Sequence, residues 1–225
     1  QFLRQTDHAG ILADDMGLGK TAQTLAHLQI EKNQQRFDRP TLIVAPTSLM
    51  GNWRREIEKF TPSLRVLTLH GPNRQQSFEQ IDQHDVVLTT YALLSRDEAT
   101  LSQHAYHMVI LDEAQNIKNP KTKAAQMLRQ LNTRHRLCLT GTPIENGMMD
   151  LWNVMDFVYP MKLGSKSDFK NEFIKSIRQA KPGTVERESL KSKLEEKLNP
   201  FWLRRVKSDV LVGDEALPPI TYFDS

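Results

Sequence analysis

The stretch that decides the fold is a glycine-containing loop near the start of the chain. It reads Asp14-Asp15-Met16-Gly17-Leu18-Gly19-Lys20-Thr21. A short apolar run at residues 11–13 precedes the loop, and a helical pattern at residues 22–30 follows it. A strand, a glycine loop, a Lys-Thr pair and a helix, in that order, are typical of a loop whose backbone N–H groups hold phosphates. The predicted phosphate-binding residues are Asp15, Met16, Gly17, Leu18, Gly19, Lys20, Thr21 and Ala22.

Two side chains of this loop have chemical roles in the prediction. Lys20 neutralises the β- and γ-phosphate oxygens of a nucleotide, and the Thr21 hydroxyl ligates Mg²⁺. The general pattern places a glycine five residues before Gly19, whereas this chain has Asp14 there. Taken alone, the loop therefore leaves a chance match open.

A second motif reduces that doubt. The apolar run at residues 108–111 ends in Asp112-Glu113-Ala114-Gln115, so a strand delivers two adjacent carboxylates to its tip. Asp112 is placed to hold Mg²⁺ through water, and Glu113 to polarise an attacking water. Such a pair after a strand is common by itself, but together with the loop it indicates a nucleotide hydrolase.

A third motif, Leu139-Thr140-Gly141-Thr142-Pro143, follows the next apolar run. Two hydroxyls around a glycine suit a loop that senses the γ-phosphate end of the site. An ordinary strand-to-loop turn is the alternative, and the motif alone favours it.

The rest of the chain alternates apolar runs with amphipathic stretches. Strands are predicted at residues 41–45, 66–69, 85–89, 108–111 and 136–139, and helices at residues 49–60 and 121–131. Strands separated by helix-length connections predict an α/β fold with a parallel sheet flanked by helices on both faces. Ligands bind such sheets at the carboxyl ends of the strands.

Two details of this pattern are specific predictions. In the helix at residues 49–60, the side chains of Leu49, Trp53, Ile57 and Phe60 fall on one apolar face. After Tyr159 the strands stop, and residues 168–177 and 185–198 read as a helical hairpin that protrudes from the body.

Composition limits the class of protein. The chain is 39% hydrophobic and 25% charged, which is typical of a globular protein, and it contains no apolar run long enough to predict a membrane span. A single cysteine, Cys138, lies in an apolar stretch; we expect it in the core of a protein from a reducing, cytosolic compartment. Residues 162–209 carry 13 Lys and Arg against 7 Asp and Glu. This basic segment fits either a nucleic-acid backbone or a solvated helical face.

Together these motifs resemble the SWI/SNF-type ATPases of helicase superfamily two. The resemblance covers residues 10–219 and includes the loop at 14–21, in which an aspartate at position 14 is normal for the family. Further matching segments are Pro46-Thr47-Ser48-Leu49 with Asn52-Trp53, Thr89-Thr90-Tyr91, residues 112–115, residues 139–143, Asp150-Leu151-Trp152 and residues 201–210.

The resemblance implies a DNA-dependent ATPase that translocates on duplex DNA, with ATP bound between two RecA-like lobes. It assigns residues 1–160 to a RecA-like lobe that is truncated at its N-terminus, 161–200 to a helical protrusion, and 201–225 to a return segment and linker. The family's arginine finger belongs to a second lobe that this sequence does not contain. We therefore expect the chain alone to hydrolyse ATP hardly at all.

The resemblance also implies roles for individual residues. It makes Lys20, Asp112 and Glu113 catalytic, with Thr21 and Asp112 at the Mg²⁺. Residues that couple hydrolysis to movement are Gln115, Thr140, Gly141 and Thr142. Predicted DNA contacts are Pro46, Thr47, Ser48, Thr89, Thr90, Tyr91, Arg204, Arg205 and Lys207, although the last three also fit a brace at the hinge to the second lobe.

The implied partners are double-stranded DNA, the second lobe and DNA-bound proteins, in the cytoplasm and nucleoid or in a nucleus. Two alternatives stay open: a lobe of a strand-separating DNA or RNA helicase, and a non-catalytic module that docks on DNA or protein.

Overall fold

The structure, a computed structural model, describes residues 9–141 and 147–205. Its centre is a seven-stranded sheet in the order β3-β4-β2-β5-β6-β1-β7, in which every pair of neighbouring strands is parallel. The strands are β1 (Ala9–Leu12), β2 (Thr41–Ala45), β3 (Val66–Thr68), β4 (Val86–Thr90), β5 (Ala105–Asp112), β6 (Asn132–Leu139) and β7 (Trp202–Leu203). The predicted α/β class with a parallel sheet is confirmed.

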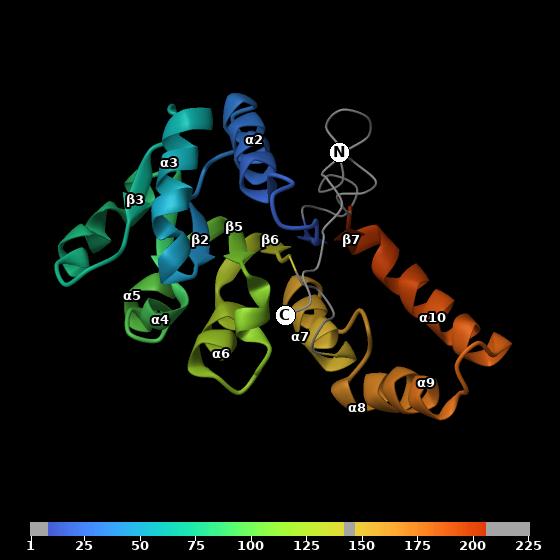
Figure 1. Cartoon of the computed structure of the whole chain (residues 1–225). Helices are drawn as coiled ribbons and strands as arrows, with labels where there is room; N and C mark the ends of the chain where they lie inside the picture. Colours follow the sequence, from blue (N-terminus) through green and yellow to red (C-terminus); the bar gives the residue numbers. More distant parts are fainter. Residues whose placement is uncertain (1–8, 142–146, 206–225) are drawn as a thin grey trace, which may run out of the picture.

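Helices cover both faces of this sheet. Figure 1 shows α2 and α3 on one face and α4, α6 and α7 on the other. The α-helices are α2 (Lys20–Asn33), α3 (Met50–Phe60), α4 (Tyr91–Leu94), α5 (Glu98–Leu101), α6 (Lys123–Gln130), α7 (Met148–Val158), α8 (Lys166–Phe169), α9 (Ser176–Gln179) and α10 (Val185–Leu198). Short 3₁₀ segments are η1 (Thr47–Leu49), η2 (Arg74–Gln83), η3 (Ala114–Ile117) and η5 (Asn199–Phe201), and η4 (Lys170–Lys175) is a π-helix.

The apolar runs become strands because the sheet is buried on both faces. Along β2, Leu42 and Val44 pack into one hydrophobic cluster, whereas Ile43 and Ala45 pack into the other. Successive side chains of a strand point to opposite faces, so an uninterrupted apolar run is what a central strand of this kind requires.

The parallel register brings the ends of distant strands to one edge. Asp112 at the end of β5 pairs with Leu139 of β6, and Leu139 pairs with Leu12 of β1. The loops that follow these three strands therefore start side by side. They are the three segments that carry the predicted chemistry.

Two details of the sequence prediction are wrong. The strands do not stop after Tyr159, because the chain returns to the sheet as β7 beside β1. Phe60 does not belong to the buried face of α3: its side chain is 48% exposed, and Met50, Trp53 and Ile57 form that face instead. Phe60 is the last residue of the helix, and the chain continues from there to strand β3.

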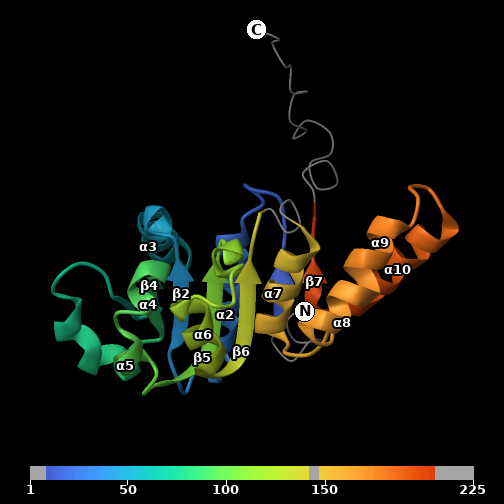
Figure 2. The ribbon, with the colours of Figure 1, turned by 90° about the horizontal axis from the view of Figure 1, so that it is seen from below.

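The helical hairpin is confirmed and is longer than its apolar spacing predicted. Helices α8, η4 and α9 run without a break from residue 166 to 179, and α10 returns beside them (Figure 2). Glu172 pairs with Lys193 at 2.6 Å and lies 3.8 Å from Lys197, which ties the two arms together. The hairpin is not a separate unit, because Phe169 and Phe173 are fully buried in a hydrophobic cluster that also contains residues of the sheet.

Two expectations from composition can be compared with the structure. Cys138 is buried in the core, as predicted. Among residues 9–141 and 147–205, no helix is both long and apolar enough to cross a membrane.

Removing a buried ring at the base of the hairpin tests this shared core. We expect Phe169→Ala to lower the free energy of unfolding by about 3–5 kcal/mol, since it deletes a fully buried aromatic side chain. Val185→Ala, at a side chain that is 87% exposed, is the control and should change stability by less than about 0.5 kcal/mol. Urea denaturation measures both. A loss below about 1 kcal/mol for Phe169→Ala would show that the hairpin folds apart from the sheet.

Candidate active site

The glycine loop and the Asp112-Glu113 pair, two of the three predicted motifs, line a cavity of about 320 Å³ at the carboxyl edge of the sheet. Its lining comes from the glycine loop, the start of α2, the region of α3, and the end of β5. The lining residues are Met16, Gly17, Gly19, Lys20, Thr21, Leu49, Asn52, Glu56, Asp112 and Glu113. Every predicted catalytic side chain therefore borders one cavity. Of the other predicted loop residues, Asp15, Leu18 and Ala22 are half-buried beside it.

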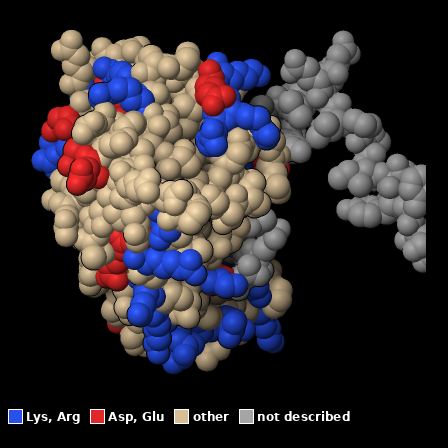
Figure 3. Space-filling view, turned by 90° about the vertical axis from the view of Figure 1, so that its left-hand side faces the viewer, with Lys and Arg blue, Asp and Glu red and all other residues tan. Residues whose placement is uncertain are grey.

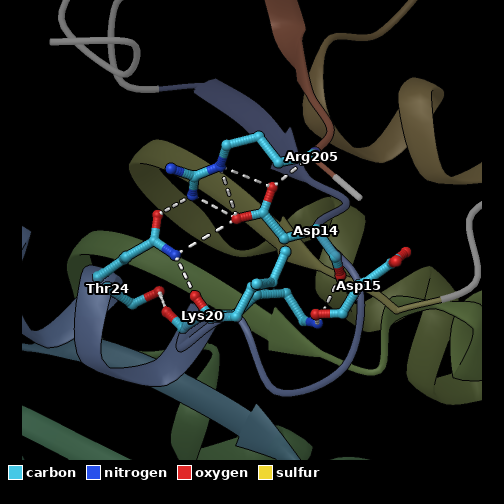
Figure 4. A network of polar contacts seen from close by, with 7 residues as sticks. Asp14, Asp15, Lys20, Thr24 and Arg205 are labelled. Atoms are coloured by element: carbon cyan, nitrogen blue, oxygen red, sulfur yellow. Dashed lines mark hydrogen bonds and ion pairs between the residues drawn. The ribbon is translucent and has the colours of Figure 1, made fainter. Parts of the chain in front are cut away.

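The glycine loop leads directly into the N-terminus of α2. Gly19 precedes the helix with φ +73°, a left-handed conformation that favours glycine. The first N–H groups of a helix lack partners within the helix, so the start of α2 offers donors and a positive partial charge. Lys20 folds back on the loop: its Nζ donates to the backbone oxygens of Asp14 at 2.7 Å and Asp15 at 3.3 Å (Figure 4).

Asp112, at the tip of β5, is held by three other residues. The indole N–H of Trp53 donates to Oδ2 at 2.7 Å, and the backbone N–H of Glu113 donates to Oδ1 at 2.9 Å. The Tyr91 hydroxyl donates to the Asp112 carbonyl at 2.7 Å. Burial raises the pKa of Asp112 above its ordinary value, the charge of Glu113 adds to this effect, and the bond from Trp53 opposes it.

Glu113 begins a hydrogen-bonded chain that leads to the third motif. Its backbone lies in the left-handed region at φ +50° and ψ +57°, which is rare for a residue other than glycine. The Gln115 side chain donates to Glu113 Oε2 at 2.6 Å, and the Thr140 hydroxyl donates to Gln115 Oε1 at 3.0 Å. The Thr140 N–H donates to the carbonyl of Leu12 in β1. Two of the predicted coupling residues thus connect the predicted base to the strand that precedes the glycine loop.

Gly141 lies against the glycine loop. A Cβ at this position would come within 3.0 Å of Met16 Cγ and 3.8 Å of Lys20 Nζ, so glycine permits the close approach of the two loops. The last predicted coupling residue, Thr142, lies outside the described residues.

The predicted DNA contacts fall into two groups. Thr47 and Ser48 are exposed and Pro46 is half-buried, so these residues are available at the surface. Thr89 and Thr90, by contrast, are buried at the end of strand β4, which lies between β3 and β2. The Thr89 hydroxyl donates to the Leu69 carbonyl.

The remaining predicted DNA contacts are Tyr91, Arg204, Arg205 and Lys207. The Tyr91 hydroxyl donates to the backbone carbonyl of Asp112. Burial keeps the pKa of Tyr91 well above its ordinary value, so the hydroxyl stays protonated and remains a donor. Arg205 forms an ion pair with Asp14, whereas Arg204 is exposed. Lys207 lies outside the described residues.

Two residues have roles in this site that the sequence pattern did not predict. Trp53 lies on the apolar face of α3 and its ring is fully buried, but its indole N–H also donates to Asp112. Asp14, which departs from the general glycine pattern, is a buried carboxylate with an ion-pair partner. That departure was the available signal, because a carboxylate at the end of a buried strand requires a partner.

A parallel sheet with a Lys-Thr glycine loop after one strand and an Asp-Glu pair after another defines a nucleotide-binding lobe of the P-loop class. Comparison with known proteins identifies the family. Residues 2–222 match the model of the SNF2-related domain. The chain belongs to this family.

Relatives and solved structures agree. The chain is 40% identical over 211 residues to the putative ATP-dependent helicase/translocase YwqA of Bacillus subtilis, covering 92% of this chain and 22% of that protein. It is 36% identical over 213 residues to the ISWI chromatin-remodeling complex ATPase ISW2 of Saccharomyces cerevisiae, covering 92% of this chain and 19% of the relative. The Sulfolobus solfataricus SWI2/SNF2 ATPase core in complex with dsDNA superimposes with a TM-score of 0.84 at 38% identity, covering 96% of this chain and 44% of that one. The chain thus spans about a fifth of these relatives and less than half of the solved core.

The hydrogen bond between Trp53 and Asp112 gives a pH-dependent prediction. Trp53→Phe removes a donor to a buried carboxylate, so we expect it to lower the free energy of unfolding by about 2 kcal/mol at pH 8 in metal-free buffer. The bond lowers the pKa of Asp112 in the folded chain, so its contribution is present above that pKa and is lost as the pH falls through it. The loss on mutation should therefore be smaller at pH 5 than at pH 8.

Trp152→Phe is the matched control. Its indole N–H donates to the uncharged carbonyl of Gly164 at 3.2 Å, so its removal should cost the same free energy at both pH values. Urea denaturation at pH 5 and pH 8 compares the two variants. Equal losses for Trp53→Phe at the two pH values would contradict the role assigned to Trp53.

Proposed function

We propose that this chain is the ATP-binding lobe of a DNA-dependent ATPase that translocates on double-stranded DNA. The observation that carries the proposal is the single cavity lined by Lys20, Thr21, Asp112 and Glu113. The hydrogen-bonded chain from Glu113 through Gln115 to Thr140 supports it, because a motor must link hydrolysis to movement. Relatives named as ATP-dependent helicases and as a chromatin-remodelling ATPase support the same reaction.

The glycine loop and the start of α2 hold the phosphates of ATP. Loop and helix N–H groups bind the phosphate oxygens, and the Lys20 ammonium neutralises their charge. In the structure, Lys20 Nζ donates to the carbonyls of Asp14 and Asp15. Lys20 therefore exchanges two neutral acceptors for charged phosphate oxygens when the nucleotide binds, and charge-assisted bonds are the stronger kind.

The donors at the cavity fit Mg²⁺. A hydroxyl from Thr21 and a carboxylate from Asp112 border the same space, and Mg²⁺ is usually held by few protein oxygens together with water and substrate phosphates. Thr21 would ligate the ion directly and Asp112 through water. When bound, Mg²⁺ neutralises charge on the β- and γ-phosphate oxygens.

Glu113 acts as the general base. Its carboxylate borders the cavity and accepts a hydrogen bond from Gln115, which fixes its orientation. It takes a proton from the water that attacks the γ-phosphorus, the bond from that phosphorus to the β–γ bridging oxygen breaks, and the products are ADP and phosphate. The left-handed backbone at Glu113 is the kind of strain that functional sites retain.

Duplex DNA is the proposed polymer partner. A solved structure that is 38% identical to this chain is a complex with dsDNA. Exposed hydroxyls of Thr47 and Ser48 suit contacts to a phosphate backbone, which position a duplex without reading its sequence. Figure 3 shows Lys and Arg side chains gathered over the lower part of one side of the molecule, an arrangement that attracts nucleic acid.

A second lobe completes the motor in this proposal. In this proposal residues 1–160 belong to the first RecA-like lobe, residues 161–200 to its protrusion, and residues 201–225 to the segment that leads to the second lobe. An arginine from across the cleft typically contributes a factor of about 10³–10⁵ in rate, so this chain alone should bind ATP and hydrolyse it very slowly. Such a motor works on protein–DNA complexes in a nucleoid or a nucleus.

The general base is the residue whose removal tests the reaction. In the protein that joins this chain to its second lobe, Glu113→Gln should lower duplex-stimulated ATP hydrolysis by about 10²–10⁴-fold, because the amide does not accept the proton. Nucleotide affinity should be unchanged. A coupled assay of ADP release with and without duplex DNA measures the rate.

Glu188→Gln, at an exposed position of α10, is the control and should leave the rate unchanged. Stimulation by single strands or RNA but not by duplex DNA would favour the strand-separating helicase. A protein that no nucleic acid stimulates would instead be the non-catalytic docking module.

A further inference from the structure

Asp14 is a buried carboxylate at the beginning of the glycine loop. It stands where the general phosphate-loop pattern has a glycine, and it is 0% exposed. A buried carboxylate is costly unless it is paired and hydrogen-bonded. Its partners therefore indicate why this loop tolerates it.

Those partners come mainly from Arg205, which lies 191 residues further along the chain. The backbone N–H of Arg205 donates to Asp14 Oδ1 at 2.9 Å, and its Nε lies 3.1 Å from Oδ2 and 3.2 Å from Oδ1. The Arg205 Nη2 group also donates to Oδ2. Figure 4 shows the guanidinium laid along the carboxylate.

The sheet itself creates this juxtaposition. Strand β7 runs parallel to β1, with Trp202 opposite Ile11 and Leu203 opposite Leu12. The pairing continues beyond the strands, since the Ala13 N–H donates to the Leu203 carbonyl and the Asp15 N–H donates to the Arg205 carbonyl. Arg205 is thus fixed beside Asp14 by backbone bonds on both sides of the contact.

The same network reaches the residues that face the phosphates. Gln23 of α2 donates to Asp14 Oδ2 at 3.3 Å and to the Leu18 carbonyl at 2.8 Å, and it accepts a bond from Arg205. The backbone oxygen of Asp14 accepts the bond from Lys20 Nζ. Asp14 therefore joins Arg205, α2 and Lys20 in one unit.

We propose that Arg205 is a positioning residue of the nucleotide site, which holds Asp14 so that the glycine loop keeps its shape and the Lys20 ammonium remains available to phosphate. This inference rests on the proposed function. Without Arg205, the carboxylate of Asp14 lacks its cationic partner. The Lys20 ammonium already donates to the backbone carbonyl of Asp14 and is therefore the cation available to that carboxylate. Competition by Asp14 for Lys20 then weakens phosphate binding. The nucleotide site is complete only when the chain has returned to the sheet as β7.

Nucleotide affinity of the chain tests the proposal. With fluorescent N-methylanthraniloyl-ATP as the probe, Arg205→Ala should raise the Kd by about ten- to a hundredfold, the same range as the loss of metal affinity when a group that orients metal ligands is removed. Arg205→Lys keeps the positive charge but loses the bidentate hydrogen bonding of the guanidinium to the carboxylate. The Kd of this variant should therefore lie between those of the wild type and Arg205→Ala. If Arg205→Ala does not fold, Arg205→Lys decides by itself, because unchanged affinity in that variant overturns the proposal.

Arg74→Ala is the matched control for loss of a buried ion pair. Arg74 donates two 2.7 Å bonds to Asp97, whose side chain is as buried as that of Asp14. Its removal should lower thermal stability as much as Arg205→Ala but leave the Kd unchanged. Equal effects of the two variants on the Kd would show that Arg205 acts only through stability and would overturn the proposal.

Two further variants separate the inference from the function on which it rests. Lys20→Ala should abolish tight binding of the probe, and retention of binding would contradict the proposed function itself. If Lys20→Ala weakens binding but folded Arg205→Ala binds as the wild type does, only the role of Arg205 is wrong. Asp14→Ala and Arg205→Ala should not add in the double variant, whereas additive effects on log Kd would show that the two residues act independently.

Discussion

The parallel pairing of β5, β6 and β1 is the constraint on which the site depends. Because the strands run in one direction, the residues that follow Leu12, Asp112 and Leu139 all emerge at the same edge of the sheet. A one-residue change of register would turn each strand's side chains to the opposite face, so the hydrophobic clusters on the two faces fix this alignment. The core thereby determines where the carboxylates stand relative to the glycine loop.

Hydrogen bonds convert this alignment into a connected site. One line runs from Glu113 through Gln115 and Thr140 to the backbone of β1, and another runs from Asp14 to Arg205 and Gln23. The first line reaches Leu12 of β1, and the second includes Asp14, whose backbone carbonyl accepts a bond from Lys20. In the proposed function, a movement of bound phosphate at Lys20 can be transmitted along both lines, one toward the third motif and one toward Arg205 after β7.

The sequence predicted the sheet and the position of the Asp112-Glu113 motif at the end of a strand because both are local patterns. Residues 41–45 form β2 as predicted, and Asp112 stands at the tip of its strand as expected. Strand β7 was missed because two residues carry no periodicity. The bonds of Trp53 to Asp112 and of Arg205 to Asp14 join positions far apart in the chain, and nothing in the sequence near either residue specifies the partner. Thr89 and Thr90 were predicted from a motif as DNA contacts, and the motif did not indicate that the strand buries both side chains.

On nucleotide binding, phosphate oxygens should replace the Asp14 and Asp15 carbonyls as acceptors for Lys20, while the ion pair between Asp14 and Arg205 persists. A crystal structure of this chain with Mg²⁺, ADP and beryllium fluoride tests it most directly. We predict Lys20 Nζ on the γ-phosphate mimic, the metal ion beside Thr21 and Asp112, and an unbroken ion pair between Asp14 and Arg205. A nucleotide bound elsewhere, or Lys20 still bonded to the Asp14 carbonyl with the site filled, would contradict the account.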